Sequence, residues 1–211
     1  MFDSKDFKKA ALSQLKGRWK TPCLVTLTML VIFTITSSST FMTEGTAGFF
    51  ISAFVYGSSI LAITSLYRML FLYSNPVTYS DFISGFSQFI RGTLAFLWMS
   101  LWITIWSFLF VIPGIVKGFA YSQMFYILSE NPDVGIIKAM NISKVLTKGH
   151  KADLFVLTLT FIGWNFLSIL TCGILFIWVI PYMTMTFTDA YYYLKQEALR
   201  TGKLTPADFE K

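Results

Sequence analysis

Two stretches decide the fold: NPVTYSDFISGFSQFIRG at residues 75–92 and NPDVGIIKAMNISKVLTKG at residues 131–149. Each begins with Asn-Pro, continues through an amphipathic stretch, ends in a basic residue followed by glycine, and precedes a long apolar run. The residue before a proline is disfavoured in the α-helical region, so each Asn-Pro is predicted to end the helix before it. We therefore interpret both stretches as joints between apolar hairpins.

The composition is typical of an integral membrane protein. Apolar residues make up 55% of the 211 residues and charged residues only 13%, whereas a soluble domain has about 25% charged residues. Several windows contain the roughly 20 apolar residues that cross a hydrocarbon core of ~30 Å. The net charge of +6 does not indicate nucleic-acid binding, because the basic residues lie at the ends of apolar runs, where they set topology and meet lipid head groups.

Six apolar segments follow a basic N-terminal stretch and form three pairs. They cover residues 22–40, 47–73, 94–112, 114–129, 154–170 and 173–194. Short connections join the members of each pair, among them Ile112-Pro113-Gly114 and Thr171-Cys172-Gly173. Proline and glycine at these points indicate turns, so each pair is predicted to be a helical hairpin. The fourth and fifth segments are short, so whether the hairpin around Pro113-Gly114 spans the membrane fully stays open.

The predicted repeating unit is an amphipathic helix, a basic-Gly joint and a transmembrane hairpin. Residues 4–20 supply the first amphipathic helix, with an apolar stripe and a basic flank that indicate a helix lying among lipid head groups. The stripe consists of Phe7, Ala11, Leu15 and Trp19, and the joints are Lys16-Gly17, Arg91-Gly92 and Lys148-Gly149. We predict one domain over residues 1–211 with repeats at about 4–73, 76–129 and 133–194, and a tail at 195–211.

The predicted fold class is all-α. It is a polytopic bundle of six transmembrane helices arranged as three hairpins, each preceded by a cytoplasmic interfacial amphipathic helix. Lysine and arginine are concentrated in the N-terminal stretch, the 130–153 connection and the tail, whereas the hairpin tips have none. The positive-inside rule therefore predicts that both termini and all the amphipathic helices are cytoplasmic.

Further motifs carry a resemblance to a known family. They are an Ile-Pro-Gly-Ile-x-Lys turn at 112–117, a Ser-Lys-x-x-x-x-Gly-His-Lys segment at 143–151, an Ile-Gly-Trp helix at 162–164 and the pair Pro181-Tyr182. With these motifs the chain resembles the bacterial integral membrane family known as domain of unknown function 975. The resemblance covers nearly the whole chain and implies a six-helix protein of the bacterial cytoplasmic membrane. It implies no activity.

Ionisable residues inside apolar segments are costly and are the first functional candidates. Arg68 and Asp189 have similar predicted depths near the cytoplasmic ends of their segments, so we predict an ion pair that joins the first and third hairpins. Lys117 lies near the outer face, where its long side chain is expected to reach head groups, a lipid phosphate or an acidic group of a partner. Asp153 is expected to begin the fifth transmembrane helix, because a carboxylate suits a helix N-terminus.

Two groups of residues are candidates for lipid or ligand binding. Lys148, His150 and Lys151 are expected to face head groups, and Trp98, Trp102 and Trp106 share one face of the third apolar segment. The tryptophans are interpreted as packing or lipid contacts, or as a groove for an acyl chain or an amphiphilic peptide. His150 is the only histidine and has no cluster of carboxylates or thiols around it. We therefore expect no metal site, no cofactor and no catalytic residues.

We expect a non-enzymatic membrane protein that binds lipid or a protein partner, in an accessory, envelope-homeostasis or immunity role. The expected partners are membrane lipids with anionic head groups at the cytoplasmic face and a membrane protein. A small transporter or channel is the alternative, which repeats and broken helices favour. A continuous polar cavity at the bilayer midplane would favour transport, whereas a core closed by Phe and Leu would favour binding.

Overall fold

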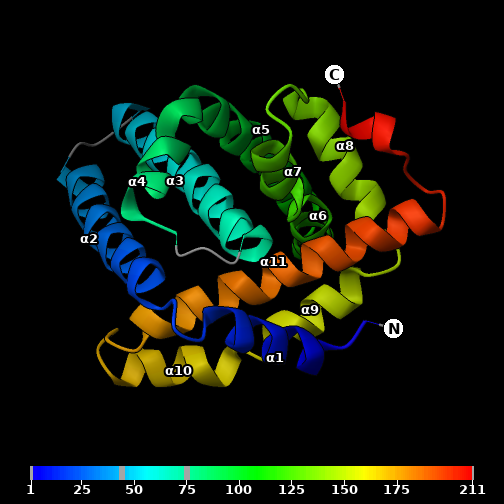
Figure 1. The fold of residues 1–211 in the computed structure, drawn as a ribbon. Coiled ribbons are helices and arrows are strands. Elements are labelled where there is room, and N and C mark those ends of the chain that lie inside the picture. The colour runs from blue at the N-terminus through cyan, green and yellow to red at the C-terminus, as the bar shows by residue number, and fades with distance from the viewer. Residues whose placement is uncertain (1, 43–45, 74–76, 211) are drawn as a thin grey trace.

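The computed structural model describes residues 2–42, 46–73 and 77–210, and within them the chain is all-α, with no strand. Its elements are α1 (Ser4–Leu15), α2 (Lys20–Met42), α3 (Thr46–Leu72), α4 (Tyr79–Ser84), the 3-10 helix η1 (Gly85–Gln88), α5 (Phe89–Leu109), α6 (Val111–Tyr121), α7 (Met124–Glu130), α8 (Ile136–Leu146), α9 (Lys151–Leu159), α10 (Ile162–Leu170), α11 (Phe176–Arg200) and the 3-10 helix η2 (Pro206–Phe209). In Figure 1, α11 crosses the middle of the molecule, with α1, α9 and α10 on one side and α3 and α5 to α8 on the other.

Five stretches of the described chain are long and apolar enough to cross a membrane: Lys20–Ser37, Gly48–Leu72, Tyr79–Phe108, Val111–Glu130 and Lys151–Leu170. They correspond to the first five predicted apolar segments, so the all-α, membrane-compatible class is confirmed. The sixth predicted segment lies in α11, which is not among them and carries Asp189, Lys195 and Glu197 in its C-terminal half. A crossing by α11, and with it the arrangement of six spans, stays a prediction.

The turns of the second and third hairpins differ in how well they were predicted. Between α10 and α11, Cys172 (φ 53°) and Gly173 (φ 86°) form the expected turn. The second turn was placed wrongly: the chain breaks in extended backbone at Phe110, and Pro113 and Gly114 lie in the first turn of α6. Proline is tolerated there because the first N–H groups of a helix have no acceptor within it. The tip of the first hairpin with Glu44, and Asn75-Pro76, lie outside the described residues.

The fourth apolar segment is two helices, because the chain breaks between α6 and α7 at Ser122 and Gln123. Buried Ser143 on α8 satisfies this break: its Oγ donates to Ala120 O at 2.8 Å and accepts from the Gln123 N–H at 3.2 Å. Thr147, one turn further along α8, is also completely buried. The amphipathic stretch 131–149 therefore packs two polar side chains, Ser143 and Thr147, against the bundle, where unpaired backbone groups need hydrogen-bond partners.

The fifth apolar segment is also broken, at Thr160 and Phe161 between α9 and α10. Lys8 on α1 donates from Nζ to Thr160 O at 2.9 Å, and the same ammonium lies 4.2 Å from the centre of the Phe161 ring. A cation is favourable at the carbonyl end of a helix. Partial burial at this site lowers the pKa of Lys8 from its ordinary value.

Helices α3 and α5 approach each other closely at two glycines. A Cβ added at Gly57 would come 2.6 Å from Gly92 O, and a Cβ added at Gly92 would come 2.6 Å from Gly57 O. Small residues allow such close packing of helices. Gly92 is therefore helical, and the predicted joint at Arg91-Gly92 is wrong. The other two predicted joints are turns, since Gly17 (φ 78°) and Gly149 (φ 96°) have left-handed backbone.

Candidate functional site

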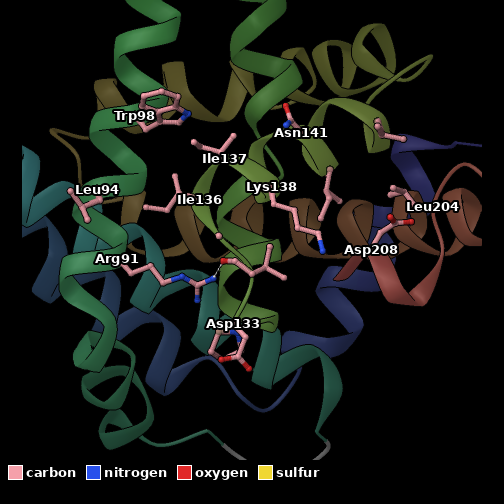
Figure 2. A pocket seen from close by; sticks show the side chains of 15 residues that line it. Arg91, Leu94, Trp98, Asp133, Ile136, Ile137, Lys138, Asn141, Leu204 and Asp208 are labelled. Carbon is pink, nitrogen blue, oxygen red and sulfur yellow. Dashed lines mark hydrogen bonds between the residues drawn. The ribbon is translucent and has the colours of Figure 1, made fainter. Parts of the chain in front are cut away.

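An open groove of about 1100 Å³ lies between the first half of α5, residues 132–145 around α8, and the C-terminal segment (Figure 2). We call it the α5–α8 groove. Figure 2 shows Leu94 and Trp98 reaching it from α5, with Lys138 and Asp208 on its other side. Its lining residues are Arg91, Leu94, Trp98, Pro132, Asp133, Val134, Gly135, Ile136, Ile137, Lys138, Asn141, Ile142, Val145, Leu204 and Asp208.

Arg91 fixes one end of the groove by binding the C-terminus of α7. Its Nη1 donates to Leu128 O at 3.0 Å, and its Nη2 donates to Asn131 O at 2.8 Å and to Val134 O. The last carbonyl oxygens of a helix receive no hydrogen bond from within the helix, so a guanidinium that donates to them is stabilising. These bonds hold the segment that leads into α8 against α5.

The walls of the groove are mainly apolar. Leu94 on α5 is 51% exposed and Ile137 on α8 is 57% exposed. Trp98 packs edge-to-face on Trp102 with ring centres 5.9 Å apart, and its buried indole Nε1 has no hydrogen-bond partner among the described residues. A buried indole N–H usually has a partner, so this donor is left unsatisfied beside the groove.

The charges that line the groove balance. They come from two cations, Arg91 and Lys138, and two anions, Asp133 and Asp208. Asp133 lies close enough to Arg91 to act on its charge, and Lys138 acts in the same way on Asp208. The groove therefore offers separated positive and negative groups with no net formal charge.

The C-terminal segment is docked on α8 at the far side of the groove. Lys138 Nζ donates to Glu210 O at 2.5 Å. The side chain of Phe209 is buried in the main apolar cluster, which includes Met124, Leu128 and Tyr191. Asp208 closes the first turn of η2 by accepting from the Thr205 N–H at 2.7 Å and the Thr205 hydroxyl at 2.9 Å. These hydrogen bonds hold the pKa of Asp208 below its ordinary value.

The groove continues onto an exposed apolar face of α5. A neighbouring hollow of about 500 Å³ shares Arg91, Leu94 and Ile136 with it and adds Phe89 and Ile90. Phe89 is 41% and Ile90 is 62% exposed. Exposed apolar faces of this kind are typical of membrane or partner contacts, and the groove opens onto this one.

The three predicted tryptophans lie along α5 but do not form one surface. Trp98 lines the groove, and Trp98 and Trp102 are half-buried against the main apolar cluster. Trp106 instead lies beneath Lys117, whose Nζ is 4.4 Å from the ring centre. Two residues predicted separately, Lys117 and Trp106, therefore contact each other.

The basic run that contains His150 lies at the start of α9. His150 Nδ1 is 2.9 Å from Asp153 Oδ2, and its Nε2 is 3.3 Å from Glu197 Oε2 on α11. Lys148 is exposed and Lys151 is half-exposed on either side. The inward contacts of His150 differ from the predicted orientation toward head groups, whereas Asp153 lies in the first turn of α9 as expected.

The predicted ion pair between Arg68 and Asp189 is wrong. Ion pairs among the described residues join His150 with Asp153 and Glu197, and Lys195 with Glu130. Asp189 Oδ1 instead accepts from Gln14 Nε2 at 2.9 Å. Similar depth in two helices does not determine which faces meet, and here α1 covers the face of α11 that carries Asp189.

A family model described as Protein of unknown function (DUF975) matches residues 108–199. This part of the chain belongs to the DUF975 family. The resemblance stated from the motifs is thereby confirmed over these residues. No curated protein and no solved structure matches the chain. The DUF975 match includes the α8 wall of the groove, whereas Arg91, Leu94 and Trp98 on the α5 wall precede it.

Proposed function

We propose that this chain is a non-enzymatic, multi-pass protein of the bacterial cytoplasmic membrane that binds a zwitterionic phospholipid in the α5–α8 groove. One observation carries the proposal: an apolar groove, open toward the lipid-facing side of α5, is bordered by separated charges that cancel. This combination matches a molecule with apolar chains and a head group that carries one positive and one negative charge.

The polar border of the groove is expected to supply most of the selectivity. Acyl chains are as apolar in the bilayer as in the groove, so moving them brings little hydrophobic gain. The lipid phosphate would face the Lys138 ammonium, and the head-group ammonium would face Asp133. Trp98 lies two turns from Arg91 along α5, or ~10 Å at ~1.5 Å per residue, where it lines the groove beyond the charged border.

The contacts between joints and helix ends support an orientation with the groove at the cytoplasmic face. Thr21 at the start of α2 donates to Val77 O, in the segment before α4, at 2.7 Å. Lys138 on α8 contacts Glu210 in the tail. Each of these contacts pairs two segments that the positive-inside rule assigns to the cytoplasmic face if α11 crosses as a sixth span.

The cavity enclosed by α2, α3 and α11 supports binding rather than transport. It has a volume of about 70 Å³ and is lined by eight side chains, of which only Thr26 and Tyr67 are polar. That space holds a water or two. Its other lining residues, such as Met29 and Phe33, close the bundle with apolar side chains.

The test is crosslinking with a zwitterionic phospholipid that carries a photoreactive group on one acyl chain, in vesicles that contain the full chain. We expect the label on peptides from the first half of α5 and from α8. Competition by the same unlabelled lipid should reduce it more than competition by an anionic lipid with the same chains. Labelling spread evenly over exposed apolar helices such as α10, or a protein crosslinked to the groove instead, would contradict the proposal.

A variant at the border of the groove has a matched control. Lys138→Gln removes the cation that faces the phosphate and is expected to lower labelling of α8. Lys203→Gln removes an exposed lysine that does not line the groove, and should leave labelling unchanged. Equal labelling of both variants and of the unaltered protein would remove Lys138 from the proposed site.

A further inference from the structure

Asp189 lies inside the bundle with one carboxyl oxygen lacking a partner. The residue is only 6% exposed, and its Oδ1 accepts from Gln14 Nε2 at 2.9 Å. Its Oδ2 has no hydrogen-bond partner among the described residues, and the same holds for Gln14 Oε1. Both unpartnered atoms are buried, and they belong to two planar groups that already share one hydrogen bond.

An ionised Asp189 leaves both of these oxygens unsatisfied. A carboxylate only accepts hydrogen bonds, and the amide oxygen of glutamine also only accepts, so the two cannot bond without an added hydrogen. Burying a charge without a partner is costly. A proton on Oδ2 removes the charge and supplies the missing donor in one step.

We propose that Asp189 binds a proton on Oδ2 in the folded protein and that the resulting hydroxyl donates to Gln14 Oε1. The acid and the amide then form a closed ring with two hydrogen bonds. This ring joins α1 to α11. The ligand of the site is a proton, and the proposal does not depend on the phospholipid groove.

The cations on α1, in the turn that follows it and on α3 do not bind Asp189. Lys8 on α1 donates to Thr160 O, and Arg18 donates to the carbonyl oxygens at the end of α3. Arg68 on α3 acts electrostatically on Tyr191 and Tyr192. None of these cations forms an ion pair with Asp189 in the described part of the chain.

The remaining titratable neighbours are two tyrosines and a thiol, which are neutral at ordinary pH, and one lysine, which contacts a tyrosine ring instead. Tyr126 on α7 is close enough for the charge of an ionised Asp189 to act on it, and its hydroxyl bonds to Thr188. Tyr67 on α3 is completely buried, and Cys23 on α2 is a free thiol. Lys144 on α8 faces Tyr121, with Nζ 5.6 Å from the ring centre. No cation therefore pairs with Asp189 among the described residues, and a bound proton neutralises its charge instead.

Loss of the proton is expected to weaken the attachment of α1. The folded state binds the proton more tightly than the unfolded chain, so the stability it contributes falls as the pH rises. Asp189→Asn mimics the protonated acid, because its amide donates to Gln14 Oε1 and accepts from Gln14 Nε2. Asp189→Asn should therefore keep the two hydrogen bonds at every pH.

The experiment uses the full chain in detergent micelles and has two readouts. The infrared spectrum of the unaltered protein should contain a protonated-carboxyl C=O band that shifts in heavy water and is lost in Asp189→Asn. The melting temperature of the unaltered protein should fall between about pH 5 and about pH 9 relative to Asp189→Asn. Asp6→Asn, which removes an exposed carboxylate from α1, should retain the pH dependence of the unaltered protein.

Either of two results overturns the proposal. One is an infrared spectrum in which no protonated-carboxyl band depends on Asp189. This reading comes from the unaltered protein, so it does not require that a variant folds well. The other is a melting temperature of Asp189→Asn that lies below that of the unaltered protein by the same amount at every pH.

Discussion

Arg18 and Arg91 make the same contact at the ends of two different helices. Arg18 donates to Tyr73 O at 2.8 Å, which is the C-cap carbonyl of α3. It also donates to Leu70 O, three residues earlier, at 3.2 Å. Arg91 donates to Leu128 O and Asn131 O, which hold the same two positions at the end of α7. Arg18 lies just before the first hairpin and Arg91 lies in the first turn of the second, and each binds the C-terminal end of a later helix of its hairpin.

This shared contact gives the predicted repetition a physical basis in the first two units. Both arginines satisfy carbonyls that a helix end leaves free. The third unit has no arginine at its joint, and His150 contacts Glu197 near the end of α11 instead. The internal repeat itself stays a prediction. The contact between each arginine and a helix end depends on the three-dimensional structure and is not visible in the sequence.

Replacing either arginine by lysine should destabilise the protein. In Arg18→Lys and Arg91→Lys one ammonium replaces a planar fork, so at least one charged hydrogen bond to a helix end is lost, at about 1.5–3 kcal/mol. Denaturant unfolding in mixed micelles measures the loss. Arg200→Lys changes an exposed arginine and should unfold like the unaltered protein. If all three variants unfold alike, the guanidinium contacts do not stabilise the helix ends.

The contact between α3 and α5 predicts opposite results for alanine at different glycines. Gly57→Ala and Gly92→Ala place a methyl group 2.6 Å from a backbone oxygen, so the helices must separate, at about 1–3 kcal/mol or more. Gly118→Ala adds a methyl group in open space within α6, which should stabilise by about 0.5–1 kcal/mol. Melting temperatures of the three variants measure these opposite effects on stability. A harmless Gly57→Ala would show that the helices are not this close.

Ser143 supports the break between α6 and α7. Ser143→Ala leaves the buried Ala120 carbonyl and the Gln123 N–H short of a partner, so it is expected to cost about 1–3 kcal/mol. Ser13→Ala is the control, because Ser13 is exposed and bonds only to Ala10 in its own helix. Equal unfolding midpoints for the two variants would count against a role for Ser143 at this break.

Asp208 predicts how the C-terminal segment responds to pH. Its pKa is held below the ordinary value by Thr205, so its stabilising effect exists above the ordinary aspartate pKa and is lost as the pH falls through the lowered value. Asp208→Asn should speed hydrogen exchange of the 201–210 peptide at about pH 7 and have little effect at about pH 3. An equal effect at both pH values would mean that the charge on Asp208 is not what matters.

Much of the fold follows from the sequence, because the apolar segments and their punctuation are local signals. The first five membrane-compatible stretches and the turn at Cys172-Gly173 were predicted from spacing. The stripe of Phe7, Ala11 and Leu15 was also recognised, but it was expected in a helix among lipid head groups, whereas these side chains are buried in the protein. Pro113 and Gly92 were misinterpreted because each residue has two common uses. Proline occurs in turns and in the first turn of a helix, and glycine occurs in hinges and in close helix contacts.

The candidate site was largely missed, because it depends on which elements meet. Trp98 was the one predicted binding residue that lines the α5–α8 groove. Arg91 was noted only as part of a joint. A basic residue can also bind the C-terminal end of a neighbouring helix, so its presence in the sequence is a usable signal for such a contact. Asp189 was correctly singled out as costly to bury, but its partner is Gln14 on α1. A one-dimensional depth estimate does not identify that neighbour.

The most direct test of the phospholipid groove is native mass spectrometry of the purified protein released from membranes with a zwitterionic phospholipid. Leu94→Trp fills the groove, whereas Leu101→Trp changes a leucine two turns further along α5 that is equally exposed at 51% and does not line it. We predict one retained phospholipid on the unaltered protein and on Leu101→Trp, and roughly tenfold less on Leu94→Trp, which corresponds to about 1.4 kcal/mol. Equal retention by all three proteins, or no retained lipid on the unaltered protein, would contradict the account.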